Sequence, residues 1–151
     1  MPKITPFLWF DGQAEEAMNH YISIFKDGKV LNVNRANGQV LTVTFELRGQ
    51  RFIGLNGGPL FKFTEAVSFF VDCDTQEEVD AFWDKLSEGG QKSRCGWLKD
   101  KYGLSWQIVP KALMQLMSDP DPRKSKAVLD AMMKMDKIVI KDLQKAHEAA
   151  A

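Results

Sequence analysis

The first sixty residues alternate between apolar segments of two different periods, and this pattern predicts one strand, one helix and three further strands. Ile4 to Phe10 form a short apolar run that ends at Asp11-Gly12, which is typical of a strand. The next segment carries apolar side chains three and four positions apart, as one face of a helix does, and Asp27-Gly28 ends it. Three further strand segments follow. The predicted elements are a strand over 4–10, a helix over 14–25 and strands over 29–35, 40–47 and 51–55.

Two local signals mark the ends of these elements. Asn37-Gly38 separates two strand segments, and this pair tolerates the positive φ angles of a tight hairpin. Asp11 is the expected N-terminal cap of the helix, because a short acidic side chain can accept a hydrogen bond from the first free N–H groups. The order of the first half is therefore β-α-β-β-β.

The same order then repeats. Thr75 to Glu78 form a capping box in front of a second helical stripe that ends at Gly89-Gly90. Glu15-Glu16 and Glu77-Glu78 lie 62 residues apart, and Tyr21 and Trp83 keep this offset. The repeat predicts a duplicated β-α-β-β-β module. Its second copy has strands over 66–73, 92–95, 96–99 and 104–109, and a helix over about 76–88.

The segment after Pro110 changes to a helical pattern. The run Asp119-Pro120-Asp121-Pro122 breaks it, and Ile138 to Ile140 read as an extended piece. The predicted helices cover 111–118, 123–135 and 141–151. A methionine-rich stripe on the second of them packs either on its own domain or on a partner, and packing on its own domain is the favoured interpretation.

Composition narrows the classes of function. The 151 residues carry 20 Lys and Arg against 20 Asp and Glu, so the chain lacks the basic excess of a nucleic-acid binder. No apolar run approaches the roughly 18 residues of a membrane span, and no secretory signal follows Met1. We therefore expect a cytoplasmic protein with reduced cysteines, Cys73 and Cys95, and neither a nucleic-acid nor a membrane partner. With 10 Phe and 4 Trp but only 2 His, the chain has many rings and few groups that titrate near neutrality.

Strand alternation predicts which side chains face a cavity. Each predicted module has a helix on one face of its sheet, so the other face is left for a cavity between paired modules. Ser68 and Gln107 would be costly on the helix-packed face, and we place them and Asn56 toward the cavity. The alternative, that these are satisfied polar residues of the sheet, stays open. Aromatic side chains are expected around them: Phe70, Trp97 and one of Trp9 or Phe10.

Three blocks of the sequence resemble a known family. They are Phe7–Ala17, Leu55–Pro59 and Cys95–Pro110, and the last is the most specific. They are similar to the PhnB-like branch of the glyoxalase/bleomycin-resistance/dioxygenase (vicinal oxygen chelate) superfamily, which often carries the domain label 3-demethylubiquinone-9 3-methyltransferase. The resemblance implies an α+β fold of paired βαβββ modules, a homodimer and a small-molecule cavity. We expect a glyoxalase-like domain over 1–110, with modules over 4–58 and 66–109, and a helical extension over 111–151.

The resemblance also locates the positions that bind metal in metal-dependent members. They fall on Pro6, Ser68, Gln107 and either Gly54 or Asn56. A divalent transition metal prefers imidazole, carboxylate or thiolate donors, which these residues do not supply. We therefore expect no glyoxalase-like metal site and no cofactor.

The methyltransferase label lacks support in the residues. A glycine-rich turn that binds a nucleotide-like cofactor leads from a strand into a helix, whereas Gly57-Gly58 leads into Pro59 and an extended segment.

Three hypotheses remain at this point. The first is a PhnB-like protein that binds an apolar or aromatic small molecule without a metal. The second is an enzyme of the superfamily, either a lyase, isomerase or dioxygenase, or the methyltransferase that the label names. The third is a dimeric scaffold with a filled cavity. Whether the protein is an enzyme is left undecided by the residues.

Overall fold

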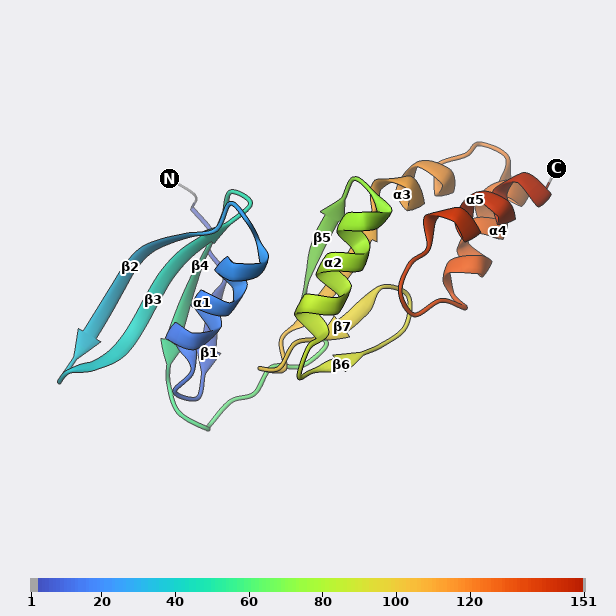
Figure 1. Cartoon of the computed structure of the whole chain (residues 1–151). Coiled ribbons are helices and arrows are strands. Elements are labelled where there is room, and N and C mark those ends of the chain that lie inside the picture. Colours follow the sequence, from blue (N-terminus) through green and yellow to red (C-terminus); the bar gives the residue numbers. More distant parts are fainter. Residues whose placement is uncertain (1–2, 151) are drawn as a thin grey trace. The chain divides into compact units, whose positions relative to one another are not determined.

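The computed structural model describes residues 3–150, and the chain divides into two compact units with the boundary along the sequence between Phe63 and Thr64. Each unit contains one four-stranded sheet and a helix that packs on one of its faces (Figure 1). The duplicated β-α-β-β-β order predicted from the sequence is confirmed, and with it the α+β fold. Ala151, which the pattern placed in the last helix, lies outside the described residues.

The first unit is a mixed sheet in the order β1-β4-β3-β2. The strands β1 and β4 are parallel, because the chain crosses over through the helix, and the other pairs are antiparallel. In chain order its elements are β1 (Phe7–Phe10), α1 (Ala14–Ile24), β2 (Lys29–Ala36), β3 (Gln39–Leu47) and β4 (Gln50–Asn56).

The core of the first unit lies between α1 and one face of this sheet. Alternate residues of β3 are buried, as expected for a strand with one covered face. The ring of Tyr21 on α1 stacks on Phe45, which stacks in turn on Phe52. The hairpin between β2 and β3 turns at Asn37 and Gly38, whose φ angles of 53° and 77° confirm the predicted turn.

The second unit repeats this arrangement in the order β5-β8-β7-β6. Thr75 caps the helix by accepting a hydrogen bond from the Glu78 N–H at 3.2 Å, as the capping box predicted. In chain order the elements are β5 (Ser68–Cys73), α2 (Gln76–Ser87), β6 (Gln91–Lys92), β7 (Trp97–Lys99) and β8 (Ser105–Pro110).

Three strands of the second unit, β5, β6 and β7, are shorter than predicted. The strand expected from residue 66 begins at Ser68, and Val67, just before it, is 64% exposed. The strand expected over 92–95 ends at Lys92. Cys95 and Gly96 have positive φ angles, and their N–H groups donate to the carbonyls of Met135 and Asp136 instead of to a neighbouring strand.

Three C-terminal helices pack together in the second unit, namely α3 (Lys111–Met117), α4 (Pro122–Met132) and α5 (Ile140–Ala149). Val109 at the end of β8 joins their core, which contains Leu113, Val128, Ile138 and Leu143. Three methionines, Met117, Met132 and Met135, pack against this core, in agreement with packing within the chain's own domain.

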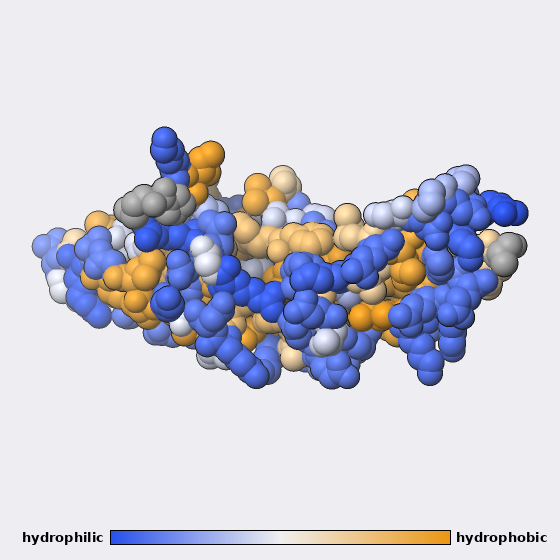
Figure 2. Space-filling view, turned by 90° about the horizontal axis from the view of Figure 1, so that it is seen from above, coloured by the Kyte–Doolittle hydropathy of each residue, from blue (hydrophilic) through white to orange (hydrophobic). Residues whose placement is uncertain are grey.

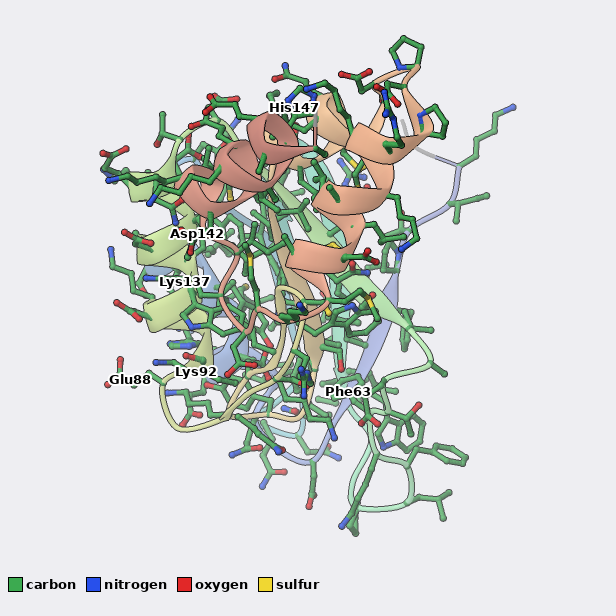
Figure 3. All side chains as sticks on the ribbon, turned by 90° about the vertical axis from the view of Figure 1, so that its right-hand side faces the viewer. Phe63, Glu88, Lys92, Lys137, Asp142 and His147 are labelled. Atoms are coloured by element: carbon green, nitrogen blue, oxygen red, sulfur yellow. The ribbon has the colours of Figure 1, made fainter. Side chains whose placement is uncertain are left out.

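The segment before α5 is held against α2. Gln76 donates from Nε2 to the Ile138 carbonyl at 3.0 Å and accepts the Ile140 N–H at 2.7 Å. Lys137, which lies just before α5 (Figure 3), pairs with Asp80 at 2.9 Å. The predicted extended piece is therefore irregular at Ile138 and Val139, and Ile140 already begins α5; the Gln76 side chain bonds to the Ile138 carbonyl and to the Ile140 N–H. No helix within residues 3–150 is both long and apolar enough to span a membrane.

Candidate functional site

The sheet of the second unit has one face packed on α2 and one face that carries a mixture of polar and aromatic side chains. Val71, Trp106 and Ile108 point to the helix and are buried. On the opposite face, the strand register aligns two rows across neighbouring strands. The polar row consists of Ser68, Ser105, Lys99 and Gln91, and the aromatic row consists of Phe70, Gln107 and Trp97.

The aromatic row contains an amide between two rings. Gln107 lies on the central strand and is the register partner of both Phe70 and Trp97. Its Nε2 donates to the Ser68 hydroxyl at 3.0 Å. Phe70 is 51% exposed, whereas Gln107 and Trp97 are half-buried. The structure thus brings together Ser68, Phe70, Trp97 and Gln107, four of the residues that strand alternation had placed toward a cavity.

An open depression of about 220 Å³ lies at the β6 and β7 side of this face. Lys99 forms an ion pair with Glu65 at its border. The hydrogen bond from Lys99 lowers the pKa of the Glu65 carboxyl below its ordinary value, and the attraction between the two charges acts in the same direction. The depression is lined by Glu65, Gln91, Ser93, Trp97, Leu98, Lys99 and Ser105.

Ser105 is the least expected residue of the depression. Its side chain is fully buried, and its hydroxyl has no hydrogen-bond partner among residues 3–150. Most buried polar groups in proteins are hydrogen-bonded, so an unpaired hydroxyl needs an explanation. This serine was not among the residues expected at the site, although its spacing of two from Gln107 puts both on one face.

The turn before β8 is built around Asp100. Its carboxylate is 2% exposed and accepts the N–H groups of Tyr102 and Leu104 at 2.9 and 3.0 Å. The second oxygen accepts the indole N–H of Trp106 at 2.9 Å. Because Trp106 points toward the helix side, this bond fixes Ser105 and Gln107 on the opposite face. Sequence reasoning missed this positioning role of Asp100.

In the first unit, Trp9 lies on the face of the sheet opposite α1. Its indole N–H donates to the Gly58 carbonyl at 2.9 Å, and its ring meets Phe61 edge-on with 4.9 Å between centroids. A side chain at Gly57 would collide with the Trp9 ring, so glycine is required there. The segment after β4 is therefore folded around Trp9. Hydrophobic side chains are exposed among hydrophilic ones on the surface (Figure 2).

Phe10 and Asn56 differ from the other candidate residues in what holds them. Phe10 is 2% exposed on the face covered by α1 and contacts Phe63 edge-on, so of the alternatives Trp9 and Phe10 only Trp9 lies on the open face. Asn56 accepts the Ala14 N–H at 2.8 Å and donates to the Val40 carbonyl at 3.1 Å. It thus serves the first turn of α1, the role that Asp11 was expected to fill, because no side chain caps the helix from its own segment.

The residues at the inferred metal positions do not fit a transition metal. In the first unit Pro6 has no side-chain donor, and both polar groups of Asn56 are used by the backbone. In the second unit Ser68 and Gln107 bond to each other. Residues 3–150 contain no group of three or more His, Cys, Asp or Glu side chains arranged to hold a metal ion.

Comparison with known proteins identifies the family. The family model described as 3-demethylubiquinone-9 3-methyltransferase matches residues 2–109. A PhnB protein from Bacillus cereus is 38% identical, with a TM-score of 0.68 over 72% of this chain and 99% of that chain. The chain belongs to this family. It is the PhnB-like branch of the glyoxalase/bleomycin-resistance/dioxygenase superfamily, as the sequence blocks had suggested.

Two further solved structures share the PhnB-like fold at lower identity. Protein PA1353 from Pseudomonas aeruginosa has a TM-score of 0.62 at 17% identity, over 73% of this chain and 98% of that chain. A gene product from Arabidopsis thaliana has a TM-score of 0.51 at 19% identity, over 70% and 96%. Comparison with curated proteins gave no match. The family match ends at residue 109, so α3, α4 and α5 follow the matched part of the chain.

Proposed function

We propose that this PhnB-like protein binds an apolar or aromatic small molecule on the open face of the second sheet, without a metal ion. The observation that carries the proposal is the aromatic row, in which the Gln107 amide lies between Phe70 and Trp97. Rings supply contact area at low cost in conformational entropy, and an amide adds one directional hydrogen bond. Binding pockets in proteins combine these two features.

The alternative, that Ser68 and Gln107 are only satisfied polar residues, accounts for their mutual hydrogen bond but not for Phe70. A ring that is half exposed in the same row as a second, half-buried ring is expected where a partner or ligand completes the surface. This contrast favours the binding function.

Titration of the ¹⁵N-labelled protein with toluene and with indole tests the proposal. We expect chemical-shift changes on β5, β7 and β8, and Phe70→Ala should weaken binding about tenfold because it removes one ring contact. Leu129→Ala is the matched control, since Leu129 is an exposed apolar residue on α4 at 38% exposure. The proposal fails if neither probe shifts these strands or if both variants bind alike.

The family description names a methyltransferase, and an enzymatic function remains the second candidate. Against S-adenosylmethionine binding, Gly57 and Gly58 lead into Pro59 and an irregular segment rather than into a helix. Calorimetry with S-adenosylmethionine should therefore show no binding, and micromolar affinity would establish the enzymatic alternative. Elemental analysis of the purified protein should find no stoichiometric metal. A stoichiometric metal that is lost in Gln107→Ala would contradict the proposal.

We further propose that the protein is a cytoplasmic homodimer. Phe7 is 57% exposed on the open face of the first sheet, and a second copy would bury such a side chain. Cys73 and Cys95 are not joined in a disulfide, which fits a reducing compartment. Light scattering coupled to size exclusion should give twice the chain mass of 17.1 kDa, and a monomer at all concentrations would refute the dimer.

A further inference from the structure

The depression beside Trp97 holds a hydroxyl with no partner, and this carries an inference about the chemistry of the ligand. We propose that the depression receives the polar group of the ligand, and that the ligand is an uncharged ring compound bearing a hydroxyl or amide group. The inference rests on the proposed function, because it assumes that a ring binds against the aromatic row. It adds which polar group that ring carries and where the group lies.

Ser105 supplies the hydrogen-bonding partner. Its hydroxyl can both donate and accept, is fully buried, and has no partner among the described residues. By register it is the direct neighbour of Lys99 on β7 and of Ser68 on β5. Ser68 already accepts from Gln107 and Lys99 pairs with Glu65, so the buried hydroxyl of the polar row that has no partner is that of Ser105.

The arrangement of the two rows orients the ligand. Trp97 belongs to the aromatic row and also lines the depression, whereas Ser105 belongs to the polar row and forms another part of the same lining. A ring that contacts the Trp97 indole would therefore direct a substituent toward Ser105. Gln91 and Ser93, on the far side of the depression, offer further neutral polar groups.

The charges of the depression favour a neutral ligand. Lys99 and Glu65 are the charged residues of its lining, and they pair with each other. An anionic ligand would compete with Glu65 for Lys99, and a cationic ligand would compete with Lys99 for Glu65. A hydroxyl or amide group disturbs neither partner and satisfies Ser105.

The volume restricts the ligand to a small molecule. Pockets for drug-sized ligands are typically about 300 to 1,000 Å³. The depression is about 220 Å³, so it accommodates a polar substituent and part of one ring rather than an extended chain.

Phenol, toluene and benzoate test the inference, because they share a ring and differ in their substituent. Each is titrated into the ¹⁵N-labelled full chain, and dissociation constants are taken from the shifts on β7 and β8. We expect phenol to bind about tenfold more tightly than toluene, which corresponds to one added hydrogen bond. Benzoate should bind more weakly than phenol because its charge disturbs the Lys99–Glu65 pair.

Ser105→Ala should abolish the preference for phenol and leave toluene binding unchanged. Removing an unpaired hydroxyl should not lower the unfolding midpoint, so a failure to fold is not expected. Ser87→Ala is the matched control, because Ser87 is also buried in this unit but donates to the Trp83 carbonyl at 2.6 Å. It should keep the full preference.

The two proposals fail in different ways. If toluene and phenol bind equally well on these strands, or if Ser105→Ala keeps the preference, the ligand class is wrong while the binding function stands. Tighter binding of benzoate than of phenol likewise overturns the neutral ligand. If none of the three probes shifts β7 or β8, the proposed function itself fails.

Discussion

The buried carboxylate of Asp100 should be the most sensitive single position in the second unit. Asp100→Asn keeps one oxygen for the N–H groups of Tyr102 and Leu104. It replaces the other oxygen by an amide NH₂, which then faces the indole N–H of Trp106. Two donors in contact cannot bond, so the indole N–H is left unsatisfied in a site that is 2% exposed.

The expected cost follows from the bond that is lost. A hydrogen bond to a charged group contributes about 1.5 to 3 kcal/mol, and an unsatisfied buried donor costs about 1 to 3 kcal/mol. The lost hydrogen bond and the unsatisfied donor are partly the same effect, so their costs do not add in full. We therefore expect Asp100→Asn to lower the free energy of unfolding by about 3 kcal/mol. Flipping the amide does not help, because the NH₂ group then faces the two backbone N–H groups.

Chemical denaturation with tryptophan fluorescence measures this cost. Trp83, Trp97 and Trp106 lie in the second unit and only Trp9 in the first, so the signal reports mainly on the unit that contains Asp100. The loss of packing in Trp106→Phe cancels in a double-mutant cycle.

In the Trp106→Phe background the indole donor is absent, and Asp100→Asn should cost at least about 1.5 kcal/mol less than in the natural sequence. The reasoning would be refuted by an equal cost in both backgrounds, or by a cost below about 0.5 kcal/mol in the natural one, which is within the range of ordinary surface substitutions.

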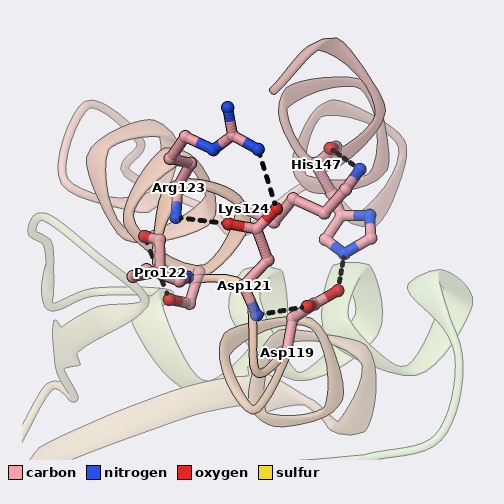
Figure 4. A network of polar contacts seen from close by, with 7 residues as sticks. Asp119, Asp121, Pro122, Arg123, Lys124 and His147 are labelled. Atoms are coloured by element: carbon pink, nitrogen blue, oxygen red, sulfur yellow. Dashed lines mark hydrogen bonds and ion pairs between the residues drawn. The ribbon is translucent and has the colours of Figure 1, made fainter. Parts of the chain in front are cut away.

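Three further predictions concern other contacts. Gly90→Ala should destabilise the chain by more than about 2 kcal/mol in denaturation experiments. Gly90 directly precedes β6, and a Cβ there would collide with the backbone carbonyl of Lys99 at the end of β7. Gln76→Ala should cost about 1 to 2 kcal/mol and remove hydrogen-exchange protection at the Ile140 amide, whose partner it deletes. The Asp121 N–H and then His147 lower the pKa of Asp119 (Figure 4), so its stabilisation is present at neutral pH and is lost as the pH falls below about 4. Asp119→Ala should flatten the acid side of the stability profile, and an unchanged profile would contradict this.

The fold was predictable because the signals that define it are local. Strand alternation and helical periodicity act over a few residues, and Asn37-Gly38 specifies its hairpin without help from distant parts. The predicted ends of the strands were wrong where contacts with distant residues determine them. Cys95 and Gly96 leave the strand because their N–H groups find carbonyls about forty positions later, at Met135 and Asp136. A pattern read along the chain does not contain this information.

The candidate site was predictable only in part, for the same reason. Alternation correctly put Ser68 and Gln107 on one face, because parity within a strand is a local property. The hydrogen bonds of Asn56 could not be predicted, because its partners, Ala14 and Val40, are set by tertiary contacts. The unpaired hydroxyl of Ser105 could not be predicted, because the absence of a partner depends on everything around it.

The C-terminal helices contribute to the candidate site although the family match ends before them. Gly96 admits Ile138 so closely that a side chain there would collide with it, and the docked segment holds the loop between β6 and β7. That loop ends at Trp97, whose carbonyl accepts the Ser93 N–H at 2.9 Å, and both residues line the depression. The wall of the depression therefore depends on residues 135–138, which lie beyond residue 109.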